Sequence, residues 1–194
     1  MSVNITYFVH GTTTDNEKNI SSGWKDVELS ELGVSQSKEL LQKIREKSSS
    51  LQEVNKDENK FDAIFCSDLK RAVDSAHITW GESDIPIIQD ERLRECNYGD
   101  YNGESSDIVE PLQEINIDNR FPNGESYNDV KNRIESFLNF LKENYDGKSI
   151  AIVAHKAPQL CLDVLLKGIT FEQAFANDWR KVKAWRAGWE YEVR

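Results

Sequence analysis

Three short apolar runs, each bounded by polar segments, organise the pattern of hydrophobic and polar positions. They are VNITYFV at 3–9, FDAIFC at 61–66 and SIAIVA at 149–154. Their length and their content of β-branched and aromatic residues predict buried strands. Because helical patterns separate the runs, their order predicts an α/β domain with a mainly parallel sheet.

Apolar residues at helical spacing fill the intervals between these runs. The clearest pattern spans 126–144, where Ser126 is a predicted N-cap and Asp129 lies in the first turn. Ser30 is a second predicted N-cap. The expected buried faces are Leu32, Leu40, Leu41 and Ile44; Leu69, Ala72, Val73 and Ala76; Tyr127, Val130, Ile134, Phe137 and Leu141; and Leu160, Cys161, Val164 and Leu165.

Two stretches lack a regular pattern. The polar segment EKSSSLQEVNKDENK at 46–60 predicts a surface loop, and residues 97–125 predict a cap-like insertion over one end of the sheet. Neither has the composition of a domain linker. Residues 1–194 are therefore expected to form a single domain.

Each predicted strand is followed by a histidine, by basic residues or by both. The carboxyl ends of parallel strands meet at one edge of a sheet, where ligands bind in open α/β folds, so these side chains are expected to gather there. Imidazoles, a guanidinium and helix N-termini together favour an anion, and phosphate fits best. Each residue alone is also compatible with a purely structural role. The residues are His10 with Gly11, Lys70 with Arg71, and His155 with Lys156.

Charge narrows the class of ligand. With 24 basic and 34 acidic residues the net charge is -10, which argues against a general binder of nucleic acid or anionic membranes. No apolar run approaches the roughly 18 residues of a membrane span, and the N-terminus lacks a signal-peptide pattern. A soluble, cytoplasmic protein is expected.

Cys66, Cys96 and Cys161 lack CxxC spacing and are interpreted as reduced thiols.

An ordered set of motifs resembles the histidine phosphatase superfamily, also called phosphoglycerate-mutase-like. The opening R-H-G-x-T-x-x-N is matched by His10, Gly11, Thr13 and Asn16. Further matches are SSGWKDVELSELG (21–33), SDLKRA (67–72), LRECNYGDYNG (93–103), PNGES (122–126) and IVAH (152–155).

The resemblance implies a three-layer fold, with a mostly parallel sheet flanked by helices, and a role for each matched residue. His10 would accept the phosphoryl group as phosphohistidine, while Arg71 and His155 neutralise its oxygens and Glu95 protonates the leaving group. This chemistry needs no cofactor and no metal. Alternatively, Glu95 is a solvated carboxylate in an acidic stretch. The implied wall of the phosphate pocket contains Gly11, Thr13, Asn16, Ser22 and Gly23.

Two positions depart from the family pattern. Val9 stands where the family has arginine before its first histidine, and Lys156 stands where it usually has glycine after the second. We hypothesise that the Lys156 ammonium takes the place of the missing guanidinium and binds phosphate. The replacement would be partial, because an ammonium lacks the fork geometry of arginine. In the alternative, Lys156 is simply exposed.

Three functions remain open. A histidine acid phosphatase-type phosphomonoesterase, acting on a phosphorylated small molecule or a phosphoprotein, is favoured. A phosphoglycerate-type mutase is less favoured, because Arg120 is the only basic residue in 97–125 and a second phosphate needs basic partners. A catalytically weak or inactive phosphate-binding or protein-binding module is the third, because Val9 removes a clamping charge.

The tail DWRKVKAWRAGWEYEVR at 178–194 is both aromatic and basic. Such a composition imitates a nucleic-acid surface. VKAW and WEYEV, on either side of Arg186, Ala187 and Gly188, instead favour a closing β-hairpin. A homodimer surface is the remaining interpretation, and no nucleic-acid partner is expected.

Overall fold

The computed structural model describes residues 2–49, 61–182 and 188–194. Within them the central sheet has the strand order β4-β3-β6-β1-β7. Strands β1 (Val3–Val9), β6 (Ser149–Ala154), β3 (Ala63–Cys66) and β4 (Ile87–Gln89) are parallel. β7 (Trp189–Val193) runs antiparallel to β1. The predicted, mostly parallel α/β sheet is confirmed.

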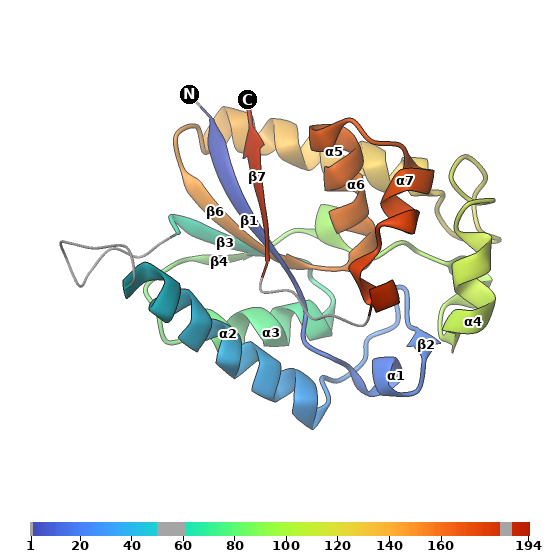
Figure 1. The fold of residues 1–194 in the computed structure, drawn as a ribbon, viewed down its shortest axis with the longest axis horizontal. Helices are drawn as coiled ribbons and strands as arrows, with labels where there is room; N and C mark the ends of the chain where they lie inside the picture. The colour runs from blue at the N-terminus through green and yellow to red at the C-terminus, as the bar shows by residue number, and fades with distance from the viewer. Residues whose placement is uncertain (1, 50–60, 183–187) are drawn as a thin grey trace.

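Helices cover both faces of this sheet (Figure 1). α2 (Glu31–Ser49) and α3 (Lys70–Trp80) lie on one face, and α5 (Tyr127–Asn144), α6 (Lys156–Lys167) and α7 (Phe171–Ala176) lie on the other. Each face has its own buried cluster of apolar side chains. The result is the predicted three-layer arrangement.

Short elements surround one end of the sheet. The two-residue strands β2 (Ile20–Ser21) and β5 (Glu104–Ser105) pair antiparallel, which ties the loop after β1 to the predicted insertion. The others are α1 (Thr14–Glu17), α4 (Ser106–Val109), η1 (Glu91–Leu93), η2 (Gly99–Tyr101), η3 (Glu110–Leu112) and η4 (Trp179–Val182).

α5 illustrates how the local sequence sets an element. The Ser126 hydroxyl accepts from Asp129 N at 3.0 Å, and Asp129 Oδ2 accepts from Ser126 N at 2.9 Å, which closes a capping box. The whole predicted apolar stripe is buried. Phe137 contacts Phe65 of β3 edge to face, with ring centroids 5.3 Å apart.

Three expectations about elements need correction or restriction. α2 continues to Ser49, so residues 46–49 are helical rather than loop, and 50–60 lie outside the described residues. Leu32 is 52% exposed and does not join the buried face. WEYEV forms β7, which pairs with β1. Most of the other predicted hairpin arm, VKAW, falls within 183–187, which lie outside the described residues.

Two further observations bear on the sequence analysis. Cys66, Cys96 and Cys161 are buried and free of disulfides. Across residues 2–49, 61–182 and 188–194, no helix combines the length and the apolar character that crossing a membrane requires.

Candidate active site

A cavity of about 480 Å³ opens where β1, β3 and β6 end. Val9 and His10 reach it from the end of β1, Arg71 from the start of α3 and Lys156 from the start of α6. Glu95 enters from the loop after η1. Residues from every predicted strand end therefore meet, as expected for a parallel sheet.

His10 is held in one tautomer. Its Nδ1 lies 2.7 Å from the Gly11 carbonyl oxygen, and because a carbonyl can only accept, Nδ1 carries the proton and Nε2 keeps its lone pair. The pKa of His10 is lowered to about 3, first by burial and then by the positive charge of Arg71. The imidazole is therefore neutral at pH 7, the form in which Nε2 is nucleophilic.

The loop carrying His10 touches the start of α2 backbone to backbone. A Cβ at Gly11 would lie 2.4 Å from the Gly33 carbonyl oxygen, and one at Gly33 would lie 2.0 Å from the Thr12 carbonyl oxygen. Gly11 N donates to Ser75 Oγ at 3.0 Å. Only glycine permits this approach, so Gly11 and Gly33 fix the path of the chain beside His10.

His155 lies fully buried at the N-cap of α6, and its ring centroid is 5.1 Å from that of His10. The Tyr7 hydroxyl donates to the His155 carbonyl at 2.6 Å and accepts from its amide at 2.9 Å. Neither ring nitrogen has a hydrogen-bond partner among the described residues. Leaving such nitrogens unpaired costs about 1–3 kcal/mol. His155 is not among the residues that line the cavity, and it lies buried beside His10.

The Arg71 guanidinium is anchored to the pocket wall and is only 3% exposed. One terminal nitrogen donates to the Lys25 carbonyl at 2.9 Å and the other to the Gly23 carbonyl at 2.7 Å. Burial first, and then the positive charge of Arg71, hold the pKa of His155 well below its usual value. Arg71 is thus the fixed positive charge beside both imidazoles.

The Glu95 carboxylate sits at the N-terminus of α6 and is 8% exposed. Oε1 accepts from Cys96 N at 2.8 Å and Ala157 N at 3.0 Å, and Oε2 accepts from Lys156 N at 3.2 Å. The alternative of a solvated carboxylate is therefore wrong: Glu95 is buried, and two of its three amide donors belong to the first turn of α6.

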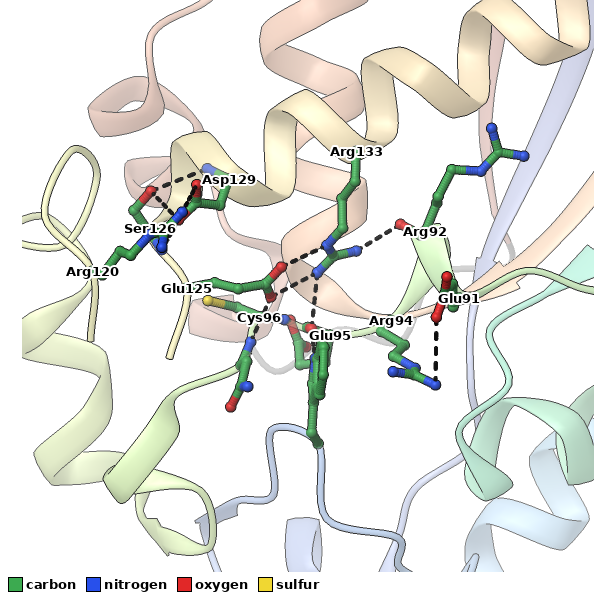
Figure 2. Close-up of polar contacts among 12 residues, drawn as sticks. Glu91, Arg92, Arg94, Glu95, Cys96, Arg120, Glu125, Ser126, Asp129 and Arg133 are labelled. Atoms are coloured by element: carbon green, nitrogen blue, oxygen red, sulfur yellow. Dashed lines mark hydrogen bonds and ion pairs between the residues drawn. The ribbon is translucent and has the colours of Figure 1, made fainter. Parts of the chain in front are cut away.

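Figure 2 shows how the loop around Glu95 is held from α5. Arg133 donates to the Glu95 carbonyl at 2.9 Å and to the Arg92 carbonyl at 2.6 Å, and it pairs with Glu125 at 3.0 Å. Glu125 in turn accepts from Asn97 N at 2.9 Å. One guanidinium thus holds the backbone on both sides of Glu95.

The predicted pocket wall divides into two groups. Asn16, Ser22 and Gly23 line the cavity. Gly11 and Thr13 do not line it; Thr13 is fully buried and caps α1, accepting from Asn16 N at 3.0 Å. These two residues therefore shape the loop, and phosphate binding by them stays a prediction.

Lys156 is buried, so the alternative of an exposed lysine is wrong. Its side chain is 4% exposed, and its ammonium lies 2.5 Å from Asp178 Oδ2 and 3.6 Å from Glu110 Oε1. Gln113 Oε1 lies 3.4 Å away. The ammonium reaches the cavity already paired, and its role in phosphate binding stays a prediction.

Sequence analysis missed several lining residues. The tail contributes Asp178, Trp179, Arg180 and Lys181. The segment 97–125 contributes Tyr98, Ser106 and Glu110, and the remaining ones are Thr12, Asn19, Ile20, Ser21 and Gln36. The basic and aromatic composition of the tail could have indicated these residues, but the sequence pattern there favoured a β-hairpin.

Comparison with known proteins finds phosphoglycerate mutases among those similar in sequence to this chain. A 2,3-bisphosphoglycerate-dependent phosphoglycerate mutase of Brucella anthropi is 31% identical over 191 residues, covering 92% of this chain and 88% of the relative. A phosphoglycerate mutase of Schizosaccharomyces pombe is 29% identical over 177 residues, covering 84% and 79%.

Solved structures have the same fold. YhfR of Bacillus stearothermophilus has a TM-score of 0.73 and 26% identity, covering 89% of this chain and 83% of its own. The alpha-ribazole phosphatase of Shigella flexneri has a TM-score of 0.72 at 24% identity, covering 89% and 84%, a likeness of fold alone. The sequence model described as "Histidine phosphatase superfamily (branch 1)" matches residues 7–189. The chain carrying this pair of histidines therefore belongs to branch 1 of the histidine phosphatase superfamily.

Proposed function

We propose that this protein is a phosphomonoesterase that works through a phosphohistidine on His10. The supporting observation is the neutral His10 imidazole, whose Nδ1 is tied to the Gly11 carbonyl while its ring borders a cavity shared with Arg71 and Glu95. The second imidazole, His155, lies beside it with unpaired nitrogens. Nucleophile, positive charge and carboxylate thus converge on one space.

In the first step His10 Nε2 attacks phosphorus in line. The P–N bond forms as the P–O bond to the leaving alcohol breaks, and a proton on the Glu95 carboxyl passes to the leaving oxygen. Arg71 stabilises the charge on the phosphoryl oxygens, and the protonated ring nitrogen of His155 donates a further hydrogen bond to them.

In the second step water attacks the phosphohistidine. The P–O bond to water forms as the P–N bond breaks, and Glu95 takes the proton from water. His10 returns to its neutral form, and the products are an alcohol and inorganic phosphate. A cavity of about 480 Å³ suits a phosphorylated small molecule, which we favour over a phosphoprotein.

A phosphoglycerate-type mutase is the second candidate, because the relatives described above carry that name. Against it, Arg120 remains the only basic residue of 97–125. Its side chain is 71% exposed and paired with Asp129. A binding module without catalysis is the third candidate, because Val9 brings no charge to the cavity.

One assay series separates these functions. Hydrolysis of p-nitrophenyl phosphate that is abolished in His10→Ala and retained in His77→Ala, together with acid-labile phosphate on His10, supports the phosphatase. His77 is a suitable control because it is exposed on α3. Transfer of phosphate between positions of phosphoglycerate supports the mutase. Absence of both activities, with retained binding of inorganic phosphate, supports the binding module and contradicts our proposal.

A further inference from the structure

A phosphomonoester brings about two negative charges to the cavity. Both imidazoles there are neutral at pH 7, because the pKa values of His10 and His155 are lowered. Arg71 is positive, but two of its nitrogens already donate to the Lys25 and Gly23 carbonyls. Val9 adds no charge, so a further cation is needed to balance the phosphoryl oxygens.

Among the residues that the structure describes, the other basic ones that line the cavity are Lys156, Arg180 and Lys181. The Lys156 charge is compensated by Asp178 at 2.5 Å, and both side chains are almost fully buried. The Lys181 side chain is exposed to solvent, where a single ammonium interacts weakly. Arg180 also pairs with a carboxylate, Glu110, but both of these side chains are partly exposed, so the pair is weaker than that of Lys156 with Asp178 and Arg180 is the best-placed additional cation.

The structure holds Arg180 at two points. Its backbone N–H donates to Asp178 Oδ1 at 3.0 Å, within the short turn η4. One terminal guanidinium nitrogen donates to Glu110 Oε1 at 2.8 Å, which anchors it to η3. The side chain remains 36% exposed, and a guanidinium has five N–H donors, so donors remain for a ligand.

The charge of Arg180 is felt at the reacting group. Arg180, like Arg71 but less strongly, lowers the pKa of His10. Arg180 lines the same cavity as His10 and Arg71, so its guanidinium faces the space that a phosphoryl group on His10 would occupy.

We propose that Arg180 is a second guanidinium for the phosphoryl group, delivered by the turn after α7 and directed by Glu110. The inference rests on the proposed function. It assigns to the C-terminal tail the positive charge that β1, ending in Val9, does not supply. Because arginine offers parallel N–H donors, it matches two phosphoryl oxygens better than Lys156 does.

Inorganic phosphate and orthovanadate are the probes, because neither carries a leaving group. We expect Arg180→Gln to weaken the binding of both by about 10- to 100-fold in isothermal titration, the value of a charge-assisted hydrogen bond. Arg180→Lys keeps the charge without the fork and should give a smaller loss. Arg194→Gln is the matched control, since Arg194 is 83% exposed at the end of β7, where it pairs with Glu192.

The outcomes are distinct from those of the functional proposal. Unchanged phosphate affinity in Arg180→Gln, or an equal loss in Arg194→Gln, overturns the role of Arg180 even if the wild type hydrolyses phosphate esters. A loss of phosphate affinity in Arg180→Gln alone supports that role even if hydrolysis is absent and the phosphatase proposal fails. Thermal unfolding of each variant shows that the chain is folded under the conditions of titration.

Discussion

The ammonium of Lys156 lies 2.5 Å from Oδ2 of Asp178, and the two side chains are only 4% and 2% exposed. This ion pair joins the first residue of α6 to the residue that precedes η4. Taking two charges out of water is costly, and their attraction offsets that cost only while both partners are present. The pair therefore fixes the path of the tail that brings Arg180 to the cavity.

Removing one partner should destabilise the protein strongly. We expect Asp178→Asn to lower the free energy of unfolding by about 3–5 kcal/mol, because the Lys156 ammonium is left buried without its nearest anion. Urea denaturation measures this loss. Asp62→Asn, which breaks the exposed pair between Asp62 and Lys148 (39% and 54% exposed), is the control, with an expected loss of about 1 kcal/mol or less. Equal losses in the two variants would contradict the prediction.

Arg133 should affect catalysis through the position of Glu95. It donates to the carbonyls of Glu95 and Arg92, so Arg133→Gln loosens the backbone beside the carboxylate and leaves the Glu95 carbonyl with the Trp24 indole N–H as its donor (Figure 2). We expect a fall in kcat of about 10- to 100-fold with little change in KM, because a displaced proton donor mainly affects the transition state.

Arg120→Gln provides the comparison for Arg133. Arg120 lies in the same region but is exposed and pairs with Asp129 (Figure 2). Its replacement should leave kcat near that of the wild type. Steady-state kinetics with p-nitrophenyl phosphate decides the matter, and a change confined to KM in Arg133→Gln would argue against positioning.

Gly33 should be intolerant of even one added carbon. In Gly33→Ala the new Cβ would lie 2.0 Å from the Thr12 carbonyl oxygen, so either α2 or the loop after His10 must move. We expect a loss of about 1–3 kcal/mol in unfolding free energy and a fall in activity, because His10 moves with the loop. Differential scanning calorimetry and kinetics measure the two effects.

Gly168→Ala is the matched control for Gly33. Gly168 has a φ of +68°, and the position that a Cβ would take is open space. The substitution should therefore cost about 1–2 kcal/mol, as backbone strain alone. It is the C-cap of α6, whose N-terminal end rather than its C-terminal end borders the cavity. Loss of stability without loss of activity is expected, and a similar loss of activity in both variants would refute the special role of Gly33.

Local sequence was sufficient for the parts of the fold that depend on local pattern. The strands around Tyr7, Phe65 and Ile152 were predictable because they are short, apolar and β-branched. Since the strands are parallel, their ends had to meet, which placed His10 and His155 together before any geometry was known.

The rest of the site depends on contacts between distant segments. Nothing near Lys156 in the sequence indicates that Asp178 would neutralise it. Arg180 could not be placed, because the path after α7 is set by that pair and by Glu110. The strand Ile87–Gln89 was missed because three residues are too few to show alternation; its pairing with β3 defines it.

The buried His155 should make the protein less stable in acid. Its pKa is well below 6.5 in the folded protein, and it returns to about 6.5 in the unfolded chain. Below pH 6.5 the unfolded state therefore binds a proton that the folded state does not, so stability falls as the pH falls. As the pH falls below about 6.5, this single group lowers the stability by at most about 1.4 kcal/mol per pH unit. His10, with a pKa of about 3, acts in the same direction.

We expect His155→Asn to unfold with a weaker pH dependence, by up to about 1.4 kcal/mol per pH unit, in urea titrations across this range. His77→Asn, which removes an exposed imidazole, is the matched control. If His77→Asn flattens the pH dependence as much as His155→Asn does, the loss of stability in acid does not come from the buried imidazole of the active site.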